Sequence, residues 1–273
     1  MKSSQKIKNR KFDDIIGNIG YYSHLLNVNG FVGFKKVNAT ESQQQEFAIA
    51  LGDRVKWIPN SHETFTPSAR FVENYSISLE ASKDQSWGEL LIPWHIDQID
   101  SPTPRVGVVW NNTIFSRSPR FGKTLFINMR KVYESVPSPD WKNFLDMVKW
   151  TSRATGVSKD LVEQHRLTGQ KMLRFCPSFI GNFGLKNDES KTYFFTVEGR
   201  DASQQELDLL NEVSSWISDQ IWHKDKFVES WEWGKGDLVA VDLSVMIHAL
   251  TKGFKTGERE FIGYWCFPQT TNQ

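Results

Sequence analysis

The sequence predicts a mainly β protein with flanking helices, built as a jelly-roll barrel or a β-sandwich. Most apolar runs after Glu89 are short and strand-like, as at residues 90–96, 105–115 and 124–129, and glycine-containing turns separate several of them. The chain also carries 11 Trp and 19 Phe, enough aromatic side chains for a thick β core. Because all-β proteins of about 270 residues often form one domain, we expect a single domain over residues 1–273.

The first elements are defined by local signals. Apolar periodicity predicts a helix over residues 12–27 and a strand over 31–37. Thr40 and Gln43 form a capping-box pattern at the start of a second helix, and Gly52 is expected to end it in the left-handed conformation. The caps therefore predict a helix over about 41–51.

Residues 58–88 show no clear periodicity and are rich in Ser, Pro and charged side chains. A long irregular segment inside a compact domain is often a lid or a binding loop. We therefore expect a substrate lid here.

The second half contains two capped helices and a final group of strands. The helices begin at Ser138, which Pro139 follows, and at Ser203, which has a Glu three residues later. A turn at 234–237 leads into apolar segments over 238–250 and 259–267, which read as strands.

Charge and cysteine content exclude several functional classes. The 33 basic and 32 acidic residues are interspersed, so we expect no nucleic-acid partner. No stretch resembles a signal peptide or approaches about 18 consecutive apolar residues, which predicts a cytoplasmic protein without a membrane partner. Cys176 and Cys266 lie in no metal-binding motif and are expected to be reduced core thiols. The sequence does not predict an oligomeric state.

His95 and Asp97 interrupt an apolar segment. If residues 95–97 continue the strand, the two side chains point to the same face. Burying both without partners would cost several kcal/mol, so a structural His–Asp hydrogen bond or a metal must satisfy them. A second pair, His223 and Asp225, follows an amphipathic helix beside lysines and is interpreted as solvent-exposed.

A third donor, His248, lies in another apolar strand. Two histidines and one carboxylate are the donor set of the facial triad that holds non-haem Fe(II). The same set serves zinc hydrolases, but no HExxH motif accompanies it here. Arg259 follows near the start of the next strand, where its guanidinium could bind a dicarboxylate in a bidentate pair.

Four blocks in the same order resemble the taurine dioxygenase (TauD/TfdA-like) family of Fe(II)/2-oxoglutarate-dependent oxygenases. They are "TESQQQEFAIALGD" at 40–53, "WHIDQ" at 94–98, "RFGKTLFINMRKVYESVP" at 120–137 and "WEWGKGDLVAVDLSVMIHAL" at 231–250. The resemblance covers nearly the whole chain. It implies a double-stranded β-helix, the cupin-like form of the jelly roll.

The resemblance also implies the chemistry. The iron ligands would be His95, Asp97 and His248, while Thr124 and Arg259 would hold the distal carboxylate of 2-oxoglutarate. With Fe(II), 2-oxoglutarate and O2, such an enzyme hydroxylates or desaturates an unactivated C–H bond of a small-molecule metabolite and releases succinate and CO2.

The chain departs from the taurine-oxidising members at the substrate. Gly263 replaces a second arginine that grips the sulfonate, so we do not expect taurine as the substrate. We expect Trp57, Asn60 and His62 to contact the substrate instead. Two other classes stay open at this point, a metal-dependent hydrolase and a non-catalytic ligand-binding protein on the same barrel.

The family's "WDNR" sequence before the distal histidine is also altered. Asp242 is kept, while Val241, Leu243 and Ser244 replace its neighbours. The hydrogen-bond support of the distal histidine is therefore expected to differ from that of the family.

Overall fold

The computed structural model describes residues 6–8, 10–65, 90–115, 122–176, 179, 181–222, 227–251 and 259–269. The chain divides into two compact units. The first comprises Met1–Pro93, Arg105–Phe126 and Glu229–Gln273, and the second comprises Trp94–Pro104 and Ile127–Val228. The single domain expected from the sequence stays a prediction.

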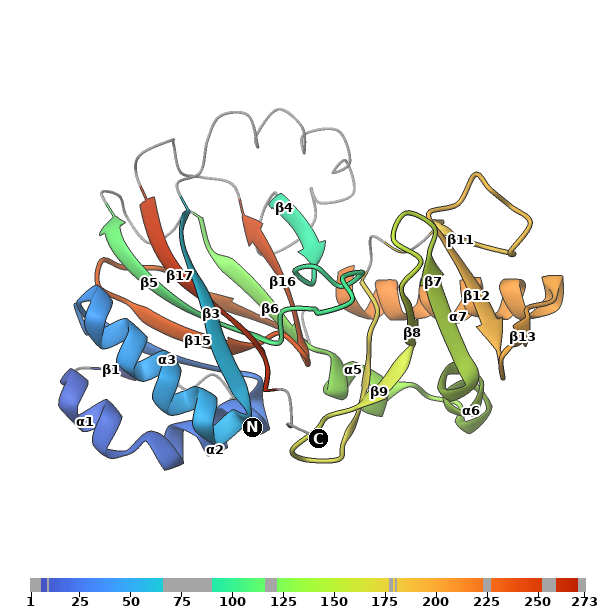
Figure 1. Cartoon of the computed structure of the whole chain (residues 1–273). Coiled ribbons are helices and arrows are strands. Elements are labelled where there is room, and N and C mark those ends of the chain that lie inside the picture. Colours follow the sequence, from blue (N-terminus) through green and yellow to red (C-terminus); the bar gives the residue numbers. More distant parts are fainter. Residues whose placement is uncertain are drawn as a thin grey trace. The chain divides into compact units, whose positions relative to one another are not determined.

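The first unit is built on a twisted, mostly antiparallel sheet (Figure 1). Its strand order is β1 (Lys6–Lys8), β2 (Phe31–Lys35), β15 (Leu238–Asp242), β5 (Gly107–Phe115), β17 (Arg259–Pro268) and β3 (Trp57–Phe65). Among the described strand pairs of this sheet, the pair of β1 with β2 is parallel and the others are antiparallel. The strands expected at 31–37, 105–115 and 259–267 are thus confirmed as elements.

Three helices cover one face of this sheet: α1 (Phe12–Gly17), α2 (Ile19–Asn29) and α3 (Glu41–Val55) (Figure 1). The buried Gln44 of α3 anchors that helix, because its Nε2 donates to the carbonyl oxygens of Val109 (2.8 Å) and Ile262 (2.6 Å). A buried amide must be hydrogen-bonded, so these two bonds fix the helix against β5 and β17.

The predicted helix over 12–27 is two helices. Asn18, between α1 and α2, has φ −116° and ψ 24°, outside the helical range. Its side chain donates to the carbonyl oxygen of Asp14 (2.8 Å), so a local side-chain bond replaces helical continuity there.

The capping box of α3 is confirmed, but its expected end is wrong. Thr40 and Gln43 exchange both capping bonds. The helix continues past Gly52 to Val55, and Lys56 takes the left-handed conformation with φ 59°. Gly52 has a different role, because a Cβ atom there would lie 2.5 Å from the carbonyl oxygen of Trp57.

The irregular segment expected at 58–88 begins instead as a strand. β3 pairs with β17 in antiparallel register from Trp57, opposite Pro268, to Phe65, opposite Phe261. Pairing with a neighbouring strand organised a segment whose own sequence shows no periodicity. Residues 66–89 lie outside the described part of the chain.

A four-stranded sheet has the order β14 (Val228–Trp231), β6 (Thr124–Asn128), β16 (Met246–Thr251) and β4 (Leu90–His95). The expected strands near 90–96 and 124–129 are confirmed. The run expected at 238–250 is two strands, β15 and β16, which belong to different sheets. At the turn between β15 and β16 the chain passes from the six-stranded sheet to the four-stranded sheet.

Within the described residues, the second unit holds short strands and the helices α5 (Met129–Ser135), α6 (Pro139–Met147) and α7 (Gln204–Trp222). One sheet has the order β11 (Phe183–Gly184), β12 (Tyr193–Val197), β7 (Val148–Ser152) and β8 (Ser158–Asp160), and β13 (Arg200–Asp201) also pairs with β12. A separate pair joins β9 (Val162–Gln164) and β10 (Lys171–Leu173).

Both helix starts expected in this part are confirmed. Ser138 Oγ accepts from the Trp141 N–H at 3.4 Å. At α7, the Ser203 N–H donates to Glu206 at 2.8 Å and Ser203 Oγ accepts from the Glu206 N–H at 3.3 Å. His223 and Asp225, which follow α7 in the sequence, lie outside the described residues.

None of the helices in the described ranges is both long enough and apolar enough to cross a membrane.

Both cysteines are buried and outside any disulfide, as the sequence predicts. Burial raises the pKa of the Cys176 thiol to about 12, and the nearby charge of Asp97 adds to the rise while that of Arg174 opposes it. We expect neither thiol of the native protein to react with a thiolate-specific reagent at pH 8, because the thiolate is the reactive form. A colorimetric thiol titration should detect two thiols in denaturant. Rapid labelling before unfolding would contradict this.

Candidate active site

His95 and Asp97 lie at the end of one strand. β4 ends at His95, and Asp97 belongs to the turn that follows, in which Gln98 has a positive φ of 53°. The expectation that both project from a single strand is therefore wrong. The turn still brings them together, with His95 Nε2 3.5 Å from Asp97 Oδ1.

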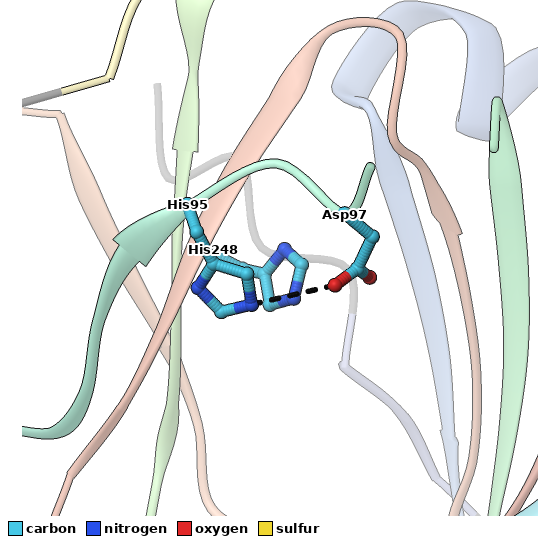
Figure 2. A group of neighbouring side chains, drawn as sticks. All are labelled: His95, Asp97 and His248. Atoms are coloured by element: carbon cyan, nitrogen blue, oxygen red, sulfur yellow. Dashed lines mark ion pairs between the residues drawn. The ribbon is translucent and has the colours of Figure 1, made fainter. Parts of the chain in front are cut away.

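His248 joins this pair from the neighbouring strand, β16. One ligand atom from each of His95, Asp97 and His248 lies within 4.8 Å of the other two. Figure 2 shows the two imidazoles side by side, with the carboxylate directed toward them from the turn. His248 is buried, whereas His95 and Asp97 are partly exposed.

The cluster fits a single metal ion. Donor atoms bound at about 2.1 Å to one ion are about 3.0 Å apart at right angles and at most about 4.2 Å apart. The 3.5 Å between His95 and Asp97 and the 4.8 Å limit for the group need only small side-chain rotations to meet this geometry. Two imidazoles and one carboxylate suit Fe(II) and leave further coordination positions for small ligands.

The turn between β15 and β16 contains hydrogen bonds that hold the strand of His248, although the "WDNR" sequence of the family is altered here. Asp242 Oδ1 accepts from the Ser244 N–H at 2.9 Å and also from the Ser244 hydroxyl. The Asp242 N–H donates to the carbonyl oxygen of Gly30 at 2.8 Å. This Asx-type turn ties the start of β16, which carries His248, to the first unit's helix–strand junction.

Thr124 begins β6, the other neighbour of β16. It is 6% exposed, and its Oγ1 accepts a hydrogen bond of 2.8 Å from Nε1 of Trp233. Arg259 begins β17 and pairs with Phe115 of β5, but its side chain lies outside the described part of the structure.

An aromatic group connects Thr124 with His248. The ring of Trp110 lies 5.5 Å from that of His248 and 6.4 Å from that of Trp233, and Trp233 packs on Phe261 at 4.4 Å. Neither Trp110 nor Trp233 could be assigned to the site from the sequence, because nothing in their local patterns separates them from ordinary core aromatics. The one signal in the sequence for Trp233 was its position three residues before Gly236-Asp237, within the block that resembles the family.

Of the three residues expected to contact substrate, only Trp57 has a described side chain. Trp57 is 1% exposed and belongs to the hydrophobic core, where its ring covers Gly107 closely enough that a Cβ there would lie 2.5 Å from it. This burial gives Trp57 a packing role in the core, and its contact with substrate stays a prediction. The backbones of Asn60 and His62 lie in β3, and their side chains fall outside the described residues.

Solved structures share this fold. A taurine dioxygenase from Burkholderia xenovorans aligns with a TM-score of 0.65 and 16% identity, over 97% of this chain and 89% of that one. The protein AAD-2, solved with Mn(II) and N-oxalylglycine, aligns with a TM-score of 0.63 and 14% identity, over 97% and 95%. At these identities the likeness establishes the fold alone, and it confirms the predicted mainly β, jelly-roll class.

Sequence comparison defines the family. No curated protein sequence matches the chain. The family model described as "Taurine catabolism dioxygenase TauD, TfdA family" matches residues 19–265, which include His95, Asp97, Thr124, His248 and Arg259. Members of this family use Fe(II), 2-oxoglutarate and O2, in agreement with the donor set found here. The chain therefore belongs to the TauD, TfdA family and is an Fe(II)- and 2-oxoglutarate-dependent dioxygenase.

Proposed function

We propose that this dioxygenase hydroxylates or desaturates an unactivated C–H bond of a small-molecule metabolite, with His95, Asp97 and His248 as its iron ligands. The observation that carries the proposal is the convergence of these three donors within 4.8 Å. No other role explains as well why two imidazoles from the adjacent strands β4 and β16 meet a carboxylate from the turn after β4.

In this proposal, each residue of the site has a specific role. His95, Asp97 and His248 would hold Fe(II) from one side, while Thr124 and Arg259 would bind the distal carboxylate of 2-oxoglutarate by a hydroxyl hydrogen bond and a salt bridge. When bound, iron and 2-oxoglutarate supply the activation of O2 and the oxidative decarboxylation that yields succinate and CO2. The aromatic rings of Trp110 and Trp233 would exclude water beside these residues.

The substrate we propose is a small amphiphilic metabolite other than taurine. Gly263 of β17 stands where the taurine-oxidising members carry the arginine that grips the sulfonate, and it pairs with Trp110 across the sheet. A glycine offers no charge to a sulfonate. The neighbouring indole presents an apolar surface at the same level of the sheet.

A metabolite screen tests the proposed function. The Fe(II)-loaded protein is incubated with 2-oxoglutarate, O2 and a library of small metabolites, and succinate is measured. Compounds that stimulate succinate formation are then analysed by mass spectrometry. A gain of one oxygen indicates hydroxylation and a loss of two hydrogens indicates desaturation, whereas stimulated succinate without either change would contradict the proposal.

The Arg259→Ala variant tests the cosubstrate site. Removing one partner of a desolvated ion pair commonly costs about 2–5 kcal/mol, so we expect KM for 2-oxoglutarate to rise at least about thirtyfold. Arg54→Ala, which removes an exposed arginine at the end of α3, serves as the control and should leave KM unchanged. An unchanged KM in Arg259→Ala would show that another residue binds the distal carboxylate.

Family membership decides against the two alternatives, a metal-dependent hydrolase and a non-catalytic binding protein. The wild type and the His95→Ala variant test the proposed metal site. Under anaerobic conditions, Fe(II) and 2-oxoglutarate together should produce a weak visible charge-transfer band, and His95→Ala should abolish it. A band of wild-type strength in His95→Ala would contradict the proposed role of His95 as an iron ligand.

A further inference from the structure

We infer that Trp233 is a positioning residue for the cosubstrate, because its indole N–H sets the Thr124 hydroxyl to donate toward the distal carboxylate of 2-oxoglutarate. The inference rests on the proposed function, in which Thr124 contacts that carboxylate. Its starting observation is the 2.8 Å bond between Trp233 Nε1 and Thr124 Oγ1, two side chains 109 residues apart in sequence.

The direction of this bond is determined by chemistry. An indole nitrogen can only donate, so Thr124 Oγ1 must be the acceptor. A threonine hydroxyl has a single hydrogen, which is left to be donated to another group. A carboxylate is an acceptor only, and it therefore matches the donor that Thr124 still offers. The bond also polarises the hydroxyl and strengthens that donor.

Trp233 is held firmly enough to impose this orientation. The indole is 1% exposed and meets the ring of Phe261 edge-on at 4.4 Å and that of Trp231 at 6.1 Å. Its backbone enters the turn at 234–237, where the Gly234 N–H donates to Asp237 Oδ2 at 2.8 Å. The Gly234 carbonyl oxygen accepts from Asn112 Nδ2 at 2.9 Å.

Thr124 is constrained from its own side. The preceding residue, Lys123, exchanges two bonds with Thr251 of β16: its N–H donates to Thr251 Oγ1 at 2.8 Å and its carbonyl oxygen accepts from the Thr251 N–H at 2.9 Å. The backbone at Thr124 is thus fixed to the strand that carries His248. The indole bond adds control of the one rotor left, the threonine side chain.

A purely structural role for Trp233 makes different predictions. In that case the threonine serves only to satisfy a buried N–H, and losing the bond changes stability without changing affinity for the distal carboxylate. Trp231 is the matched control. It is also buried and contacts Trp233, but within the described residues its Nε1 makes no hydrogen bond.

The experiment measures the affinity of the Mn(II)-loaded protein for 2-oxoglutarate by calorimetry, without turnover. We expect Trp233→Phe to weaken binding about fivefold to tenfold, because the hydrogen bond from the Thr124 hydroxyl to the charged distal carboxylate would be less well aligned. Trp231→Phe should bind as the wild type does. Affinity for 2-oxopentanoate, which has the same carbon chain but no distal carboxylate, should be equal in all three proteins.

A double-mutant cycle tests whether Trp233 acts through Thr124. In a Thr124→Val background, Trp233→Phe should have no further effect on 2-oxoglutarate affinity. Additive effects, or an unchanged affinity in Trp233→Phe alone, would overturn the inference. Wild-type affinity in Thr124→Val alone would instead refute the proposed cosubstrate contact itself, so the two failures are distinguishable.

A second substitution covers the case in which Trp233→Phe does not fold. Incorporating 3-benzothienylalanine at position 233 keeps the bicyclic shape and replaces the N–H by sulfur, which cannot donate. We expect this protein to lose 2-oxoglutarate affinity to the same extent as Trp233→Phe. Its Tm should be similar to that of other conservative core variants. Wild-type affinity in this protein would refute the positioning role.

Discussion

His248→Ala is expected to lose metal affinity by more than about 100-fold and to lose 2-oxoglutarate-coupled turnover with it. His248 supplies one of three donors, and two remaining protein ligands, His95 and Asp97, cannot hold the ion with the same affinity. Losses of 10–100-fold follow even from changes to residues that only support a metal ligand, so losing a ligand should cost more. Calorimetric titration with Mn(II) measures the affinity directly.

Thermal stability separates this loss from misfolding. A metal that binds only the native state at 100 times its Kd stabilises the protein by about 2.7 kcal/mol. His248→Ala should therefore lose the rise in Tm that the metal causes, while its metal-free Tm stays close to that of the wild type. The control is His24→Ala, which removes an exposed histidine on α2. Retained Mn(II) affinity in His248→Ala would exclude His248 as a ligand.

Gly52→Ala is expected to destabilise the protein by about 1–3 kcal/mol, although alanine normally stabilises a helix relative to glycine by up to about 1 kcal/mol. A Cβ atom at this position would lie 2.5 Å from the Trp57 carbonyl oxygen. That carbonyl cannot move freely, because Gln269 Nε2 donates to it at 3.2 Å and the Trp57 ring is buried in the core. Urea unfolding measures the change in free energy.

Gly17→Ala provides the comparison for this prediction. Gly17 is the last residue of α1, and a Cβ atom there would meet nothing within 4 Å. Its free energy of unfolding should stay equal or rise slightly. If Gly52→Ala were as stable as Gly17→Ala, the close approach of Trp57 would have no energetic consequence.

The identities of the three donors could be recognised from the sequence, but the reason for their proximity could not. The expectation for Asp97 relied on strand alternation, whereas β4 ends at His95 and a turn positions the carboxylate. The family resemblance pointed to three residues that do lie together, because it compares spacing and residue type. It does not depend on the local conformation that produces the contact.

Residues whose roles depend on distant partners were misread or missed. Gly52 was read as a helix stop, although its role is to admit the Trp57 carbonyl. Trp57 was expected to contact the substrate, and its packing in the core was not foreseen. The bond between Trp233 and Thr124 joins residues 109 apart in sequence. A local pattern carries no information about which of 11 tryptophans meets which threonine.

The sequence by itself determined the helix caps at Thr40, Ser138 and Ser203, the strand character of the main β segments and the residue types of the donor set. These features arise from hydrogen bonds and side-chain periodicity within a few residues, so local chemistry specifies them. Only the tertiary structure decided that β16 lies between β4 and β6, and thereby which histidine faces which carboxylate and which indole meets Thr124. Strand order depends on the burial of apolar surface from the whole chain, and no single segment contains that information.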